Sequence, residues 1–242
     1  MSPPSSIGAY AETATSSSPA GALAGQTRVA MHNPRRSDFD VTNTVQVSSP
    51  AAVRMAIAQL FGQVWPRAQL DALDASFARF EDMFSGRCPE YIGVDTLYHD
   101  TQHTLDITLA MARLMVGYES QVAPPLQLGA ERATVGAITA LFHDVGYLRE
   151  RGDLETTNGA EFTRNHVSRG ARFLASWLPQ VGLGHWVQRV NELIHYTGYE
   201  RPLASLALDD ERDRKLGHLL GTADMMAQMA DRCYLEKCRD RL

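Results

Sequence analysis

The chain has 242 residues, of which 44% are hydrophobic and 21% are charged. These proportions are typical of an ordinary folded protein and exclude a disordered, collagen-like or disulfide-stapled chain. The formal net charge of -5 argues against an extended basic surface for a nucleic-acid polymer. The cysteines form no C-x-x-C unit, and the sequence contains neither a secretory signal nor a long apolar run. We therefore expect free thiols, no contact with a membrane and a cytoplasmic protein.

The first 48 residues differ in composition from the remainder. Clusters of Ser and Pro between residues 2 and 19 supply few apolar groups to offset the entropy of ordering. Residues 1–48 are therefore predicted to be a flexible or extended tail, in which residues 39–47 form an extended arm through weak alternation of apolar and polar residues. Residues 49–242 are predicted to form one helical domain.

Helical signals begin at Ser49-Pro50, a capping hydroxyl followed by proline in the first turn. A second helix is expected after Pro66 and is broken by Gly86. A third is expected from about Val94 to Val116. The apolar stripes of the first two helices are Val53, Ile57, Leu60 and Phe61, then Leu70, Leu73, Phe77, Phe80 and Phe84.

Beyond the loop at Pro124-Pro125, the segment Ala133–Phe142 is too continuously apolar for a surface helix and should be central. A polar connection is expected over 145–158, followed by helices at about 159–178, 183–197 and 212–239. Within the last of these, the methionines at 225, 226 and 229 are interpreted as core packing. No strand alternation competes, which predicts an all-α bundle.

Histidine and aspartate residues stand at positions where helices can bring them together. A helix places His99, His103 and Asp106 on one face. His143-Asp144 ends an apolar helix, where polar side chains must satisfy each other or bind a cation. Adjacent residues diverge by about 100° on a helix, so both reach one ion only near a helix end or a distortion. Asp224 lies in an apolar context that a metal ion would compensate, and His and Asp ligands suit Zn, Mn, Fe or Mg.

The order His103, His143-Asp144, Asp224 on successive helices resembles the H…HD…D signature of the HD-domain metal-dependent phosphohydrolase superfamily, over about residues 90–240. The stretch from Tyr98 to Asp106 also resembles class I cyclic nucleotide phosphodiesterases. The resemblance implies an HD-domain-like helical bundle with one or two divalent metal ions. It further implies that metal-activated water cleaves a phosphomonoester or phosphodiester of a nucleotide or other small molecule. His103, His143, Asp144 and Asp224 would bind the first metal, with Asp144 bridging to any second metal.

The same resemblance assigns roles to further residues. It makes His99 the acid that protonates the leaving oxygen, Asp106 an orienting group, and His166 and His195 two more ligands of a binuclear site. The chain departs from the phosphodiesterase pattern at Asp100, where those enzymes place Asn. Those enzymes also continue well past the last metal aspartate to a purine-binding glutamine and an aromatic clamp, whereas 18 residues follow Asp224 here, so the resemblance is not extended to cyclic nucleotide specificity.

Alternatives remain open at this level. The same set of ligands also resembles that of mixed-valent di-iron oxygenases, which activate O₂ and not water. A third alternative is a non-catalytic domain that senses a ligand and in which the metal is structural. Arginines around the loop after Asp144 and near His166 form either a guanidinium fork for phosphate oxygens or a solvated face. These arginines are Arg149, Arg151, Arg164, Arg169 and Arg172.

Overall fold

The structure is a computed structural model, and it describes residues 37–66, 68, 70–235 and 239. Most of the predicted tail, residues 1–36, lies outside the described residues. Within them the regular structure is helical, and the extended pairing consists of two isolated β-bridges, Phe39 with Gln46 and Tyr91 with Glu150. The all-α fold class is therefore confirmed.

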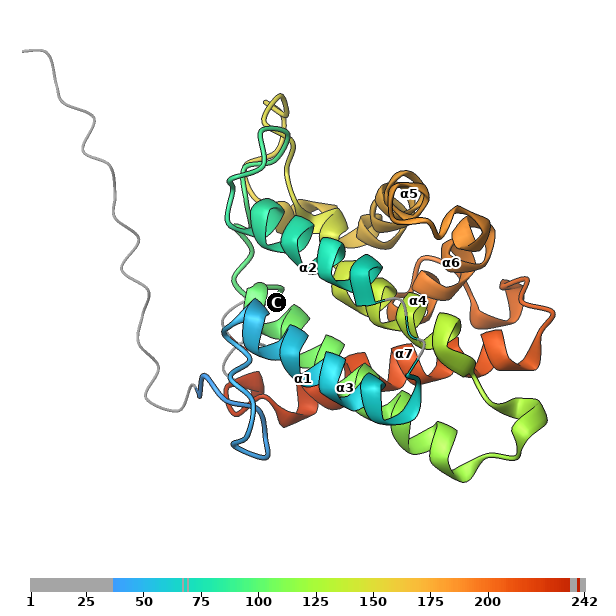
Figure 1. Cartoon of the computed structure of the whole chain (residues 1–242). Helices are drawn as coiled ribbons and strands as arrows, with labels where there is room; N and C mark the ends of the chain where they lie inside the picture. Colours follow the sequence, from blue (N-terminus) through green and yellow to red (C-terminus); the bar gives the residue numbers. More distant parts are fainter. Residues whose placement is uncertain (1–36, 67, 69, 236–238, 240–242) are drawn as a thin grey trace, which may run out of the picture. The chain divides into compact units, whose positions relative to one another are not determined.

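Seven α-helices are seen in the described part of the chain (Figure 1). They are α1 Pro50–Val64, α2 Leu70–Phe84, α3 Thr101–Gln121, α4 Gly129–Phe142, α5 His166–Trp177, α6 Val187–Leu193 and α7 Glu211–Ala230. The 3-10 helices are η1 Pro124–Leu126, η2 Val145–Tyr147, η3 Gly159–Arg164, η4 Leu178–Val181, η5 Gly184–Trp186, η6 Ile194–Thr197 and η7 Leu203–Ser205. As predicted, Ser49 caps α1, and its side chain accepts a hydrogen bond from the backbone N–H of Ala52.

The helix α4 is at the centre of the core. Every residue from Ala133 to Phe142 is buried, and α4 packs against α2, α3, α5, α6 and α7. Phe142, its last residue, lies among the rings of Phe80, Phe173 and Trp177. Burial of one such aromatic side chain stabilises the fold by about 1.5–3 kcal/mol. This packing fixes the end of α4, from which His143 and Asp144 follow.

The start of α3 differs from the prediction at Val94. Asp100 is its N-cap in an extended conformation, and its carboxylate accepts a hydrogen bond from His103 N at 2.9 Å. The hydroxyl of Thr96 donates to the carbonyl of His99 at 2.6 Å and holds the preceding segment out of the helix. Capping chemistry thus overrides the apolar pattern, and His99 precedes α3 instead of lying on it.

Two other predictions are corrected in the C-terminal half. The segment Gly159–Arg164 is the 3-10 helix η3, so α5 begins only at His166. The methionines of α7 are not core residues, because Met225, Met226 and Met229 are 51%, 50% and 74% exposed. The buried face of α7 runs through Leu216, Leu220, Ala223, Asp224 and Ala227, and the helical period turns these methionines away from it.

Residues 37–49 fold back on themselves around Asp40, in place of the extended arm that we predicted. The buried carboxylate of Asp40 accepts hydrogen bonds from Thr42 Oγ1, Thr44 N and Val45 N, and it pairs with Arg113 of α3 at 2.8 Å. Burial alone would raise the pKa of Asp40, but these donors together hold it below its ordinary value. The segment is thereby attached to α3.

Cys88 is a buried free thiol and Cys233 is also buried, while Cys238 lies outside the described residues. Within the described ranges, no helix combines the length and the apolar character needed to cross a bilayer.

Candidate metal centre

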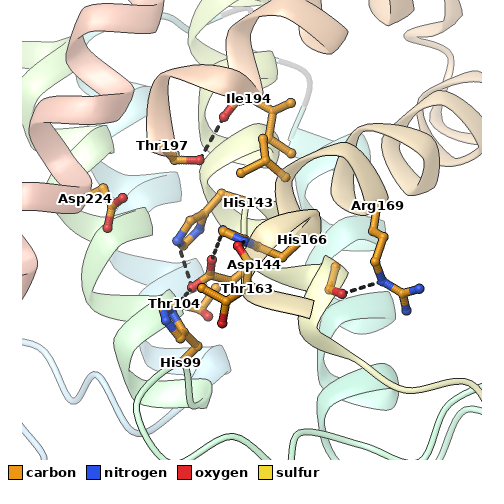
Figure 2. A network of polar contacts seen from close by, with 12 residues as sticks. His99, Thr104, His143, Asp144, Thr163, His166, Arg169, Ile194, Thr197 and Asp224 are labelled. Carbon is orange, nitrogen blue, oxygen red and sulfur yellow. Dashed lines mark hydrogen bonds and ion pairs between the residues drawn. The ribbon is translucent and has the colours of Figure 1, made fainter. Parts of the chain in front are cut away.

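Four predicted ligands, from three helices and the turn after α4, converge on one buried site. His103 comes from the first turn of α3, His143 and Asp144 from the end of α4, and Asp224 from α7. Figure 2 shows His99, His143 and His166 around the Asp144 carboxylate, with Asp224 across from His143. His103, Asp144 and His143 are each less than a tenth exposed.

The end of α4 explains how two adjacent residues reach the same site. His143 keeps helical dihedrals (φ -58, ψ -36), whereas Asp144 leaves the helix at φ -99, ψ 5. Adjacent side chains on a regular helix diverge by about 100°, and this change of direction at the helix end allows both to reach one site. Gly146 follows in η2, where a side-chain Cβ would overlap the carbonyl oxygen of His166. Because only glycine permits that approach, the turn after Asp144 lies directly against the start of α5.

Asp144 is the centre of the arrangement. Its Oδ2 lies 2.8 Å from Nδ1 of His99, 3.1 Å from Nε2 of His143 and 3.4 Å from Nε2 of His103. Its other oxygen, Oδ1, lies 3.8 Å from Nε2 of His166. The two carboxylate oxygens thus face different sets of imidazoles, as a carboxylate shared by two ions would.

Two of these imidazole nitrogens are available to bind a cation. Nε2 of His103 and Nε2 of His143 are buried and form no hydrogen bond with the described residues. The Nδ1 atoms of His143 and His166 lie 2.8 and 2.9 Å from the carbonyl oxygens of Ala140 and Thr163. A proton on Nδ1 satisfies each carbonyl and leaves Nε2 as a lone pair, which is the arrangement of a metal-ligating histidine.

Two overlapping groups of donors lie close enough to hold an ion. Ligand atoms of His103, His143 and Asp224 are within 4.8 Å of one another, and so are those of His99, His103 and Asp144. Nitrogen and carboxylate oxygen donors of this kind suit a divalent transition metal. The described residues therefore present a buried candidate metal site.

The electrostatics of the cluster point the same way. Burial raises the pKa of Asp224 above its ordinary value, because its charge lies in the interior. Burial would lower the pKa of His143, but the charge of the adjacent Asp144 carboxylate raises that pKa to about 9. Although burial opposes ionisation of Asp144, the neighbouring His143 and His99 hold its pKa well below the usual range. Without an ion, a proton on His143 compensates the Asp144 carboxylate, and a divalent cation would replace it.

The remaining predicted site residues have different placements. His99 reaches the site from outside α3, and its side chain is 21% exposed. His166 is buried, and burial lowers its pKa. His195, in η6, is buried with its Nδ1 atom unpartnered among the described residues, but it belongs to neither donor group. Asp106 lines a neighbouring cavity and is also outside both groups.

Sequence reasoning did not identify Tyr147. Its ring stacks on His99 (centroids 4.2 Å apart, planes at 19°) and on His166 (4.3 Å, 16°). It is 3% exposed. Tyr147 thus orients two imidazoles that face opposite oxygens of Asp144. Its position in a 3-10 turn carries no helical period, so the only signal was its closeness in sequence to the His-Asp pair.

The five arginines near the site were predicted either to bind phosphate oxygens or to form a solvated face. Three of them instead make structural contacts within the protein. Arg149 binds Asp95 Oδ2 at 3.0 Å. Arg169 donates to the carbonyls of Gly146 and Leu148 at 2.7 and 2.8 Å, and Arg151 donates to that of Gly86. They hold the loop after Asp144 in place. Arg164 and Arg172 are exposed.

Comparisons with protein-family models, with curated proteins and with solved structures found no match to this chain. The HD-domain resemblance therefore remains a prediction that rests on the residues themselves.

Proposed function

We propose that this protein is a metal-dependent phosphohydrolase of the HD-domain type, cleaving a phosphomonoester or phosphodiester of a small molecule. One observation carries the proposal: two buried imidazole nitrogens, which have no hydrogen-bond partner in the described part of the chain, lie beside two buried carboxylates. Buried polar atoms are costly when unsatisfied, and buried carboxylates are costly without a cation. A divalent ion bound by His103, His143, Asp144 and Asp224 would satisfy all four.

A divalent ion at this site would supply Lewis-acid chemistry, polarising a phosphoryl oxygen and lowering the pKa of water. The residues of the chain hold and orient the reactants. His99 hydrogen-bonds Oδ2 of Asp144 through Nδ1 and has the partly exposed ring of the cluster. This arrangement suits it to deliver a proton from Nε2 to the departing alkoxide. A second ion would have Oδ1 of Asp144 and Nε2 of His166, 3.8 Å apart, as ligands.

The test combines metal analysis with turnover. Protein purified without added ions is analysed for bound metal, and phenol release is followed from phenyl phosphate and diphenyl phosphate with Mn²⁺, Zn²⁺ or Mg²⁺. We expect Asp144→Ala to lose bound metal and His99→Ala to retain it but lose turnover. The matched control is His185→Ala, because His185 is an exposed histidine that pairs with Glu131.

Full metal content in Asp144→Ala, or full turnover in His99→Ala, contradicts these assignments. If the protein instead binds two equivalents of iron and its turnover requires O₂, it is a di-iron oxygenase and not a phosphohydrolase. Ligand-induced thermal stabilisation without phosphate release from a broad substrate panel would instead favour a sensing domain.

A further inference from the structure

A cavity of about 350 Å³ lies beside the metal site, between α3, the C-terminal part of α7 and residues 37–42. This volume is at the lower end of the range of about 300–1,000 Å³ for small-molecule sites. Much of the wall is apolar and includes Phe39, Val41, Leu109, Ala110, Met226 and Ala227. The exposure of Met226, which conflicted with a core role, is explained by its position on this wall.

Several polar groups of the wall are already engaged inside the protein. Asp40 is saturated by its own segment and by Arg113. The amide of Gln102 donates to the carbonyl of Ser37 at 2.6 Å. Groups of this kind offer little hydrogen bonding to a sugar or a base, so the cavity favours an occupant that is mainly apolar.

His103 belongs to both the cavity wall and the metal site. Its side chain is only 5% exposed. Its Nε2 is directed at Asp144, as described above. Its Nδ1 has no hydrogen-bond partner among the described residues, whereas His143 and His166 each have a backbone carbonyl for theirs. A metal-ligating histidine almost always donates its second N–H, so His103 lacks the acceptor that its two counterparts have.

We infer that this cavity binds a mainly apolar organic molecule whose acceptor oxygen takes a hydrogen bond from Nδ1 of His103. The hydrogen bond rests on the proposed metal site, since an ion on Nε2 fixes the proton on Nδ1. The apolar binding is independent of that site.

The experiment uses the solvatochromic ketone 6-propionyl-2-(dimethylamino)naphthalene and its analogue in which CH₂ replaces the carbonyl, 6-propyl-2-(dimethylamino)naphthalene. Each is titrated by fluorescence into the full chain, both Zn²⁺-loaded and EDTA-treated, with metal content measured on the same samples. Ala110→Trp and, separately, Ala230→Trp fill the cavity from α3 and α7. Ala75→Trp is the matched control on the exposed face of α2. Circular dichroism verifies that each variant is folded.

We expect both probes to bind in both states, with affinity reduced at least tenfold in the two cavity variants and unchanged in Ala75→Trp. In the Zn²⁺-loaded protein the ketone should bind about fivefold more tightly than its analogue, as one net hydrogen bond provides. Absence of binding, or binding that Ala110→Trp and Ala230→Trp leave intact, overturns the cavity assignment without touching the proposed function. Equal affinities in verified Zn²⁺-loaded protein overturn the role of His103. Cavity binding in a protein that takes up no metal supports the apolar site and contradicts the proposed function.

Discussion

His99 shows how a side chain outside a helix completes a site built largely by helices. It precedes the N-cap of α3, yet its Nδ1 lies 2.8 Å from Oδ2 of Asp144. That hydrogen bond leaves Nε2 as the edge that can meet a substrate. The residue is therefore positioned by Asp144 and by stacking on Tyr147, and not by the helical spacing from His103 that the sequence suggested.

If His99 protonates the leaving oxygen, its importance must depend on the leaving group. We expect His99→Ala to lower kcat for phenyl phosphate by about 10²–10⁴-fold. The loss should be much smaller for p-nitrophenyl phosphate, whose phenolate departs without a proton. Steady-state kinetics on the two esters, with metal content measured in parallel, checks this. Equal losses on both esters would assign His99 to metal or substrate binding instead.

Tyr147 is a positioning residue in this scheme, because its ring stacks on both His99 and His166. Tyr147→Leu removes the ring and should lower kcat about tenfold or more, since small misplacements of catalytic groups are costly. Tyr147→Phe keeps the ring and should retain turnover. The acidic and basic limbs of the pH–rate profile should move in the leucine variant only. Identical behaviour of the two variants would show that the stacking has no catalytic role.

At the scale of elements, the contact between η2 and α5 depends on Gly146. A Cβ at this position would overlap the carbonyl oxygen of His166, so one of the two segments must shift. We expect Gly146→Ala to lower the free energy of unfolding by about 1–3 kcal/mol, as overpacking does. Urea denaturation measures the loss. Gly152→Ala is the matched control, because nothing lies near its Cβ position, and equal effects of the two changes would contradict the argument.

The loop of residues 37–49 is attached to α3 by the pair of Asp40 and Arg113. Because the pKa of Asp40 is held below its ordinary value of 3.8, its contribution to stability is present above that value and lost as the pH falls below it. Asp40→Asn should therefore lower the free energy of unfolding at pH 7 by about 1–3 kcal/mol. The difference from wild type should shrink as the pH falls from 5 to 2.

Chemical denaturation at several pH values measures this difference. The exposed pair of Asp74 and Arg54 provides the control, since Asp74→Asn should change stability by less than about 1 kcal/mol. A gap between Asp40→Asn and wild type that does not depend on pH would contradict the role assigned to the Asp40 carboxylate.

At the scale of the whole molecule, a metal ion that binds only the folded chain must stabilise it. At a hundred times the dissociation constant the gain is about 2.7 kcal/mol. For a domain of this size that corresponds to a rise in Tm of about 5–10 °C. Thermal unfolding with Mn²⁺ or Zn²⁺, reversed by EDTA, measures it. The rise should vanish in Asp144→Ala and persist in His185→Ala, and a rise of equal size in both would place the ion elsewhere.

Much of this architecture could be predicted from local patterns. The apolar run of α4 and the capping signal at Ser49 each identify a helix, and the order of His103, His143-Asp144 and Asp224 anticipates a buried cluster. What local patterns missed depends on tertiary contacts. The start of α3 is set by the Asp100 cap, and the exposed methionines of α7 look apolar enough for a core.

The candidate ligands of the site lie far apart along the chain, from His103 in α3 to Asp224 in α7. During synthesis, the nascent polypeptide emerges with three ligands long before the fourth leaves the ribosome. If these residues bind a metal as proposed, complete coordination must therefore wait until α7 has been synthesised and has docked. A truncated or stalled product that ends before α7 would expose an incomplete set of ligands and compete poorly for scarce ions. Tight binding of a metal ion would in this way be limited to chains in which α7 has been synthesised and has folded.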